Sequence, residues 1–177
     1  MQAKPMLYVL GTCLLAATVA AGSASPSWFE AHTTGAKALA LRGAAEFGVV
    51  DGDVGPGAFV LTLGADSPTG AVVFTWPSGP RPEPGVYPLA IDPASGIQAL
   101  VVTGPPTAPT GAFRARGGTI TLTHSRDSLL EGRFEIHATG FEAADPMDEE
   151  RQLVVRGEFT AAAGSPHQTR TLSAGGR

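Results

Sequence analysis

A strict alternation of apolar and polar residues in the C-terminal half constrains the fold of this chain more than any other feature. Two segments show it, 130–139 and 152–161. The apolar positions are Leu130, Phe134, Ile136, Leu153, Val155 and Phe159. Because successive side chains of a β-strand point to opposite faces, the pattern predicts antiparallel strands with one face in a core and the other in water. We expect these six side chains to be buried together.

Shorter runs of β-forming residues extend the same interpretation to the rest of the chain. The further strand candidates are 37–50, 59–63, 72–76, 86–91, 97–102 and 119–124. The runs 59–63 and 72–76 predict a hairpin with both faces fairly apolar. The proline-rich stretches 77–84 and 104–111 cannot be helices or central strands, and no segment has a long helical period. We therefore predict an all-β fold, an antiparallel β-sandwich or a small β-barrel of about eight strands.

The triplet Gly-x-Phe occurs four times at unequal intervals. Its copies begin at Gly57, Gly111, Gly132 and Gly157. Unequal intervals exclude a repeat architecture. A glycine and a phenylalanine two positions apart lie on the same strand face, so the missing side chain predicts room for a neighbouring ring or for a bend in the sheet.

The N-terminal segment has the three-part layout of a secretory signal peptide. Lys4 gives a positive start, residues 6–21 are almost wholly apolar, and small residues occupy 20–24. The apolar run is shorter than the roughly 20 residues that a spanning helix needs, which disfavours the alternative of a permanent membrane anchor. Cys13, the single cysteine, allows a second alternative, a lipoprotein. The threonine before it and the apolar residues after it fit a lipidation site poorly.

We therefore expect an exported protein, periplasmic or extracellular, with four parts. They are a signal peptide at 1–24, a loose N-terminal segment at 25–35, a β domain at 36–163 and a disordered tail at 164–177. Cleavage removes Lys4 and no acidic residue, which changes the formal charge from −4 to −5. No cluster of Lys and Arg suggests binding to nucleic acid or to an anionic membrane, and no membrane span is expected in the mature chain.

Motifs for catalysis or for cofactor binding are missing from the sequence. It contains no Gly-x-Ser-x-Gly elbow, phosphate loop or dinucleotide fingerprint. The run 124–127 contains His, Ser, Arg and Asp, but catalytic triads are assembled from distant segments, so we expect a turn there. The four histidines lack zinc spacing, and the acidic cluster 145–150 lacks the spacing of a calcium loop. The prediction is a non-enzyme with no catalytic residue, metal or cofactor.

Four short motifs resemble those of a group of uncharacterised bacterial exported proteins and lipoproteins. The motifs lie at 85–89, 117–123, 132–138 and 155–159. They follow the order pGtYpL, sGtltIt, GtFsFtA and vtGtF. The resemblance implies export and a β fold. It implies no established activity, so it assigns no functional residue.

The function that we expect is a ligand-binding or protein-interaction module in the bacterial envelope, with a small ligand or an envelope protein as its partner. Candidate contacts are Trp76, Tyr87 and Val73, because large apolar side chains at a surface often mark binding sites. The alternative for all three is a place in the core. Two other functions stay open: an exported hydrolase using His124, and a structural surface protein without a small ligand.

Overall fold

A computed structural model describes residues 27–50, 57–76, 81–92, 96–105, 107–144 and 150–164. These residues form ten strands and contain no helix, which confirms the predicted all-β class. The predicted signal peptide lies outside the described residues, as does the predicted tail apart from Gly164.

Ten strands follow one another along the chain. They are β1 (Trp28–Gly35), β2 (Ala40–Gly43), β3 (Ala45–Val50), β4 (Ala58–Leu63), β5 (Gly70–Trp76), β6 (Gly85–Pro88), β7 (Gln98–Thr103), β8 (Gly111–Ser125), β9 (Leu129–Glu142) and β10 (Arg151–Ala163). Pairings between neighbouring strands are antiparallel except between β10 and β3. They run in a ring from β3 through β4, β5, β7, β8, β9 and β10 back to β3, and β1 and β6 extend it.

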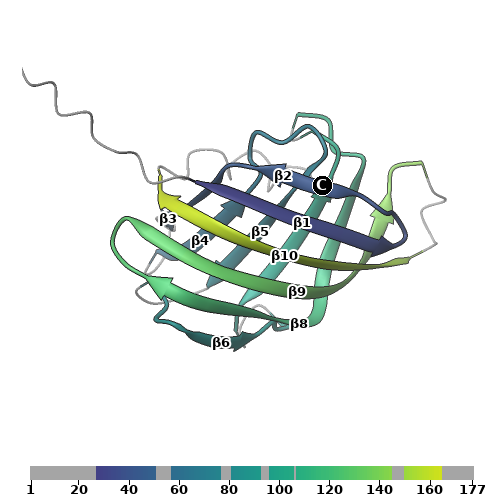
Figure 1. The fold of residues 1–177 in the computed structure, drawn as a ribbon. Coiled ribbons are helices and arrows are strands. Elements are labelled where there is room, and N and C mark those ends of the chain that lie inside the picture. The colour runs from purple at the N-terminus through teal and green to yellow at the C-terminus, as the bar shows by residue number, and fades with distance from the viewer. Residues whose placement is uncertain are drawn as a thin grey trace, which may run out of the picture.

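The strands lie in two layers around one core (Figure 1). The first layer contains β2, β1, β10, β9, the second half of β8, and β6, in that order of pairing. Behind it lie β3, β4 and β5, which pair on to β7 and to the first half of β8. The long strand β8 therefore belongs to both layers.

The corner in β8 depends on glycine. The register of β8 against β9 shifts between Ala115 and Gly117, as in a β-bulge, where a strand bends and twists more strongly. Gly118 then takes a φ of 115°, and a Cβ there would lie 2.1 Å from the carbonyl oxygen of Glu135. Only glycine fits this position, because it alone adopts positive φ readily and leaves the space for the neighbouring backbone.

A connected row of aromatic rings occupies the core. Phe59 packs edge-on against Trp76 with ring centroids 5.4 Å apart, and Phe74 meets Phe134 in the same manner at 5.3 Å. The six side chains predicted to share a core are all at most 4% exposed and belong to this cluster, so that prediction is confirmed. The hairpin of β4 and β5 also forms as predicted.

The expectation of a loose segment at 25–35 is wrong for residues 28–35, and residues 25 and 26 lie outside the described residues. Residues Trp28–Gly35 form β1, which pairs along its whole length with β10. The inward positions are Phe29, Ala31 and Thr33, and small or polar residues at two of the three conceal the alternation. Thr33 is buried because its hydroxyl donates to the carbonyl of Lys37 (2.6 Å) and accepts from the amide of Leu39 (2.9 Å).

Two strand limits also differ from the expectation. The run 37–50 divides into β2 and β3, and β8 begins at Gly111 instead of 119. The glycine pair at 117 and 118 interrupts the pattern in the sequence, yet the strand continues through the bend. Ten strands therefore stand where about eight were expected.

Candidate functional site

The outward face of the first layer carries charged and hydroxyl side chains in two rows that cross four strands. The register places Glu30, Glu158, Arg133 and Thr121 side by side on β1, β10, β9 and β8; we call this the open row. Two residues along each strand, His32, Arg156, Glu135 and Thr119 form a second line, the paired row. The two positions on each strand are two residues apart, so both rows lie on the same face of the layer. That face points away from the core, because the residues between them, such as Ile120 and Phe134, are buried.

In the paired row, Arg156 and Glu135 form a bidentate ion pair. Arg156 donates to Glu135 through Nε and Nη2, each at 3.0 Å, and His137 lies 2.8 Å from the same carboxylate. The hydrogen bonds from Arg156 and then from His137 lower the pKa of Glu135 from 4.5 to about 2, and the same contact raises the pKa of Arg156. Both oxygens of Glu135 are thus occupied by groups of the protein.

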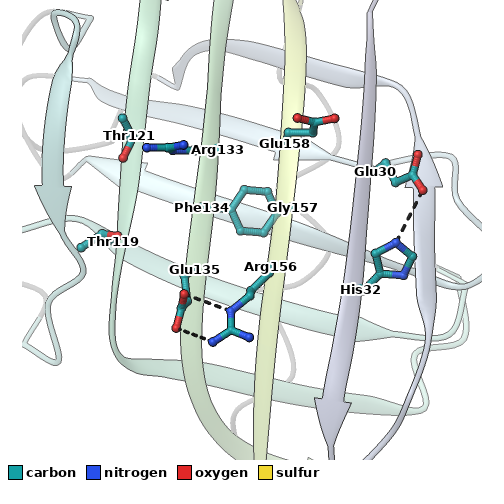
Figure 2. A pocket seen from close by; sticks show the side chains of 10 residues that line it. All are labelled: Glu30, His32, Thr119, Thr121, Arg133, Phe134, Glu135, Arg156, Gly157 and Glu158. Carbon is teal, nitrogen blue, oxygen red and sulfur yellow. Dashed lines mark hydrogen bonds and ion pairs between the residues drawn. The ribbon is translucent and has the colours of Figure 1, made fainter.

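In the open row the equivalent cross-strand pair is not formed. Arg133 lies opposite Glu158 in register, as Glu135 lies opposite Arg156. Figure 2 shows that Arg133 points toward Thr121 on β8, whereas Glu158 points toward β1. Over the described part of the chain, neither side chain takes part in a hydrogen bond or an ion pair. The open row therefore presents a cation and a carboxylate that turn away from each other.

Two acidic residues are cross-strand neighbours at the β1 side of the open row. Glu30 and Glu158 are directly opposite across β1 and β10. The carboxylate of Glu30 accepts a hydrogen bond from Arg42 Nη2 on β2 at 2.8 Å, and His32 Nε2 of the paired row lies 3.6 Å from the same oxygen (Figure 2). Like charges directly opposite in a sheet are destabilising, so Glu158 is held next to an unfavourable neighbour.

The two rows line an open hollow of about 700 Å³ on this face (Figure 2). Gly157 and Phe134, which are opposite each other in register, lie between the rows and form part of the lining. The walls thus combine acidic, basic and hydroxyl groups. Such a lining suits hydrogen bonding and ion pairing with a polar molecule.

None of the three predicted contact residues lies in this hollow. Trp76 is 7% exposed and packs between the rings of Phe59 and Phe74. Tyr87 is half-buried against the core, and its hydroxyl donates to the carbonyl of Glu83 at 2.6 Å. Val73 is half-buried on the outward face of β5, on the other layer. The structure does not bring the three together.

The residues around His124 form local contacts. His124 Nδ1 lies 2.8 Å from Glu131 Oε2, on the neighbouring strand β9. The hydroxyl of Ser125 donates to the carbonyl of Pro82 at 2.6 Å, and Asp127 accepts from Arg81 at 2.9 Å. His124 and Glu131 are thus adjacent, while the hydroxyl of Ser125 is engaged with the carbonyl of Pro82.

Within the ranges that the structure describes, no three His, Cys, Asp or Glu side chains are grouped so that they could hold a metal ion. Over those same ranges, no helix has the length and apolar character needed to cross a membrane. Of the acidic cluster at 145–150, only Glu150 is described, and it pairs with Arg116 at 3.2 Å.

The hollow cannot be predicted from alternation alone, because it depends on which strands pair and in which register. Alternation does place Arg133, Glu135, Arg156 and Glu158 on wet faces. Which of them meet depends on the register of β9 against β10, and the sequence between Glu142 and Arg151 is too long to fix that register by itself. Glu30 and His32 lie within 25–35, where the sequence pattern predicts no strand.

Comparisons with protein families, with curated proteins and with solved structures found no match to this chain.

Proposed function

We propose that this protein is a non-enzymatic binding module of the bacterial envelope, and that it binds a polar partner in the hollow between β1 and β8. The observation that carries the proposal is the contrast between the two rows. In the paired row, Glu135 and Arg156 compensate each other's charge through two hydrogen bonds. The open row leaves Arg133 and Glu158 directed apart at the rim of the same hollow.

A surface site is favoured over an interior one because the core is filled. Aromatic side chains from both layers meet there, as in the contact of Phe74 with Phe134. Filled interiors leave no room for a small molecule, whereas a hollow rimmed by a few convergent polar groups is the usual form of a binding site. The predicted signal peptide supports the envelope as the setting.

Photo-crosslinking in cells that export the protein tests this function. A photoreactive residue replaces Thr121, at the rim of the hollow, and in a second protein it replaces Val73, on the outward face of the other layer. We expect a discrete crosslinked product from position 121 and none from position 73. Crosslinking from 73 alone, or from neither position in correctly folded protein, would contradict the proposal.

A further inference from the structure

We infer that the hollow recognises an extended segment of a partner protein that carries a basic residue and, two positions later, an acidic one. This inference rests on the proposed function and specifies the chemistry of the partner. Its basis is the layout of charge along the open row, which runs from Glu30 through Glu158 and Arg133 to the hydroxyl of Thr121, with Arg42 of β2 next to Glu30.

The acidic end of the open row favours binding of a cationic side chain. Arg42 and His32 already contact Glu30, whereas the neighbouring carboxylate of Glu158 contacts no cation in the described part of the chain. A lysine or arginine side chain placed between Glu30 and Glu158 would remove the repulsion between them. It would do so without breaking an existing ion pair, which the paired row could not offer.

The other end of the open row, at Arg133 and Thr121, favours binding of an anionic group. The guanidinium of Arg133 extends over β8 toward Thr121 (Figure 2), and among the described residues it forms no ion pair. A carboxylate matches the planar donor geometry of an arginine. The hydroxyls of Thr121 and Thr119 stand beside it, where the backbone of a bound segment would need hydrogen-bonding groups.

The distance between the acidic end and the basic end of the open row matches the spacing of alternate side chains in an extended peptide. Neighbouring strands lie about 4.8 Å apart, so the midpoint between Glu30 and Glu158 is roughly 7 Å from Arg133 across the sheet. In an extended chain, residues i and i+2 point to the same side and are also about 7 Å apart. In a free α-amino acid both charges are attached to one carbon, which is too short a separation to reach both ends of the open row.

Titrations with two short peptides of identical composition test the inference. The probe is acetyl-Thr-Lys-Val-Glu-Thr-amide, whose two charges share one side when it is extended. The control is acetyl-Thr-Lys-Glu-Val-Thr-amide, whose charges point to opposite sides. Exposed ion pairs are individually weak, so we expect millimolar binding of the probe at low salt and binding several-fold weaker for the control. Equal binding of the two peptides would overturn the inference.

Variants of the protein locate the binding. Arg133→Gln and Glu158→Gln should each weaken binding of the probe about threefold, and Arg114→Gln, on the other half of β8, should leave it unchanged. Undiminished binding to both open-row variants would contradict the inference, as would equally tight binding of free glycine, whose two charges are attached to one carbon. If position 121 crosslinks in cells and the probe does not bind, the proposed function stands and the peptide inference fails.

Discussion

Phe134 on β9 lies directly opposite Gly157 on β10, and its ring occupies the space that a side chain at 157 would need. A Cβ built on Gly157 would come within 2.8 Å of Phe134 Cζ and 2.5 Å of the carbonyl oxygen of Glu30. The relationship is reciprocal, since Phe159 on β10 lies opposite Gly132 on β9 and approaches it in the same way. Two of the Gly-x-Phe triplets therefore interlock across the same pair of strands, as predicted for a glycine that makes room for a ring.

The close contact between Phe134 and Gly157 predicts that a methyl group added at position 157 destabilises the fold. Gly157→Ala should lower the free energy of unfolding by about 1–3 kcal/mol, because neither the backbone of β1 nor the buried ring can move away freely. Urea unfolding measures the change. Gly117→Ala is the matched control, since a Cβ there would meet nothing within 4 Å, and its effect should stay within about 0.5 kcal/mol. Equal effects of the two substitutions would show that the packing between Phe134 and Gly157 is wrongly assigned.

The Glu135–Arg156 contact predicts a measurable acid titration. The carboxyl of Glu135 should titrate near pH 2 instead of 4.5. Because its pKa is lower in the folded protein than in the unfolded one, the contact stabilises the fold above about pH 4.5 and loses its effect as the pH falls toward 2. Carbon-detected NMR of the Glu135 carboxyl follows this directly.

Two variants rank the causes of that titration. Arg156→Gln should raise the pKa of Glu135 more than His137→Ala does, since the hydrogen bonds from the arginine are the larger cause. A midpoint near 4.5 in the unmodified protein would mean that the bidentate contact does not persist in solution.

The neighbouring carboxylates of the open row predict a gain in stability when one is removed. Glu158→Gln should raise the free energy of unfolding by a few tenths of a kcal/mol, because it eliminates repulsion with Glu30. High salt should diminish the gain through screening. Glu83→Gln, in the segment before β6, serves as the control. A loss of stability in Glu158→Gln would instead indicate that Glu158 forms an ion pair with Arg133. Both charges of the open row would then be compensated within the protein and would not be available to a partner.

The predicted signal peptide can be tested by mass. The mature protein should begin near Gly22 or Ser25 and lack cysteine, so its intact mass should match an unmodified polypeptide. N-terminal sequencing of fractionated cells distinguishes this from an acylated chain that begins at Cys13. Full-length protein recovered from the cytosol would refute export and remove the envelope setting of the proposed function.

The sequence predicts the fold well where one face of a strand is strongly apolar. In β9 and β10 the residues Phe134, Ile136, Val155 and Phe159 mark the inward face unmistakably. In β1 the inward residues Ala31 and Thr33 are small or polar, and the burial of Thr33 depends on hydrogen bonds to a turn that the pattern cannot show.

The candidate site was less predictable than the fold because it arises from register. Arg133 and Glu158 are 25 positions apart in the sequence, and only the alignment of β9 with β10 makes them neighbours. Trp76 illustrates the converse, since its size suggested a surface contact while its place at the end of β5 directs it toward Phe59 in the core. Residue type alone therefore does not separate a site from a core position.

The central claim is that the open row holds the partner of this protein, and the crosslinking yield from position 121 tests it most directly. The measurement compares the unmodified background with an Arg133→Gln/Glu158→Gln double variant and with an Arg114→Gln/Glu83→Gln control, all carrying the photoreactive residue at 121. The account predicts that the yield falls several-fold in the double variant, which should remain folded, and is unchanged in the control. A yield that stays the same in the double variant would contradict the account.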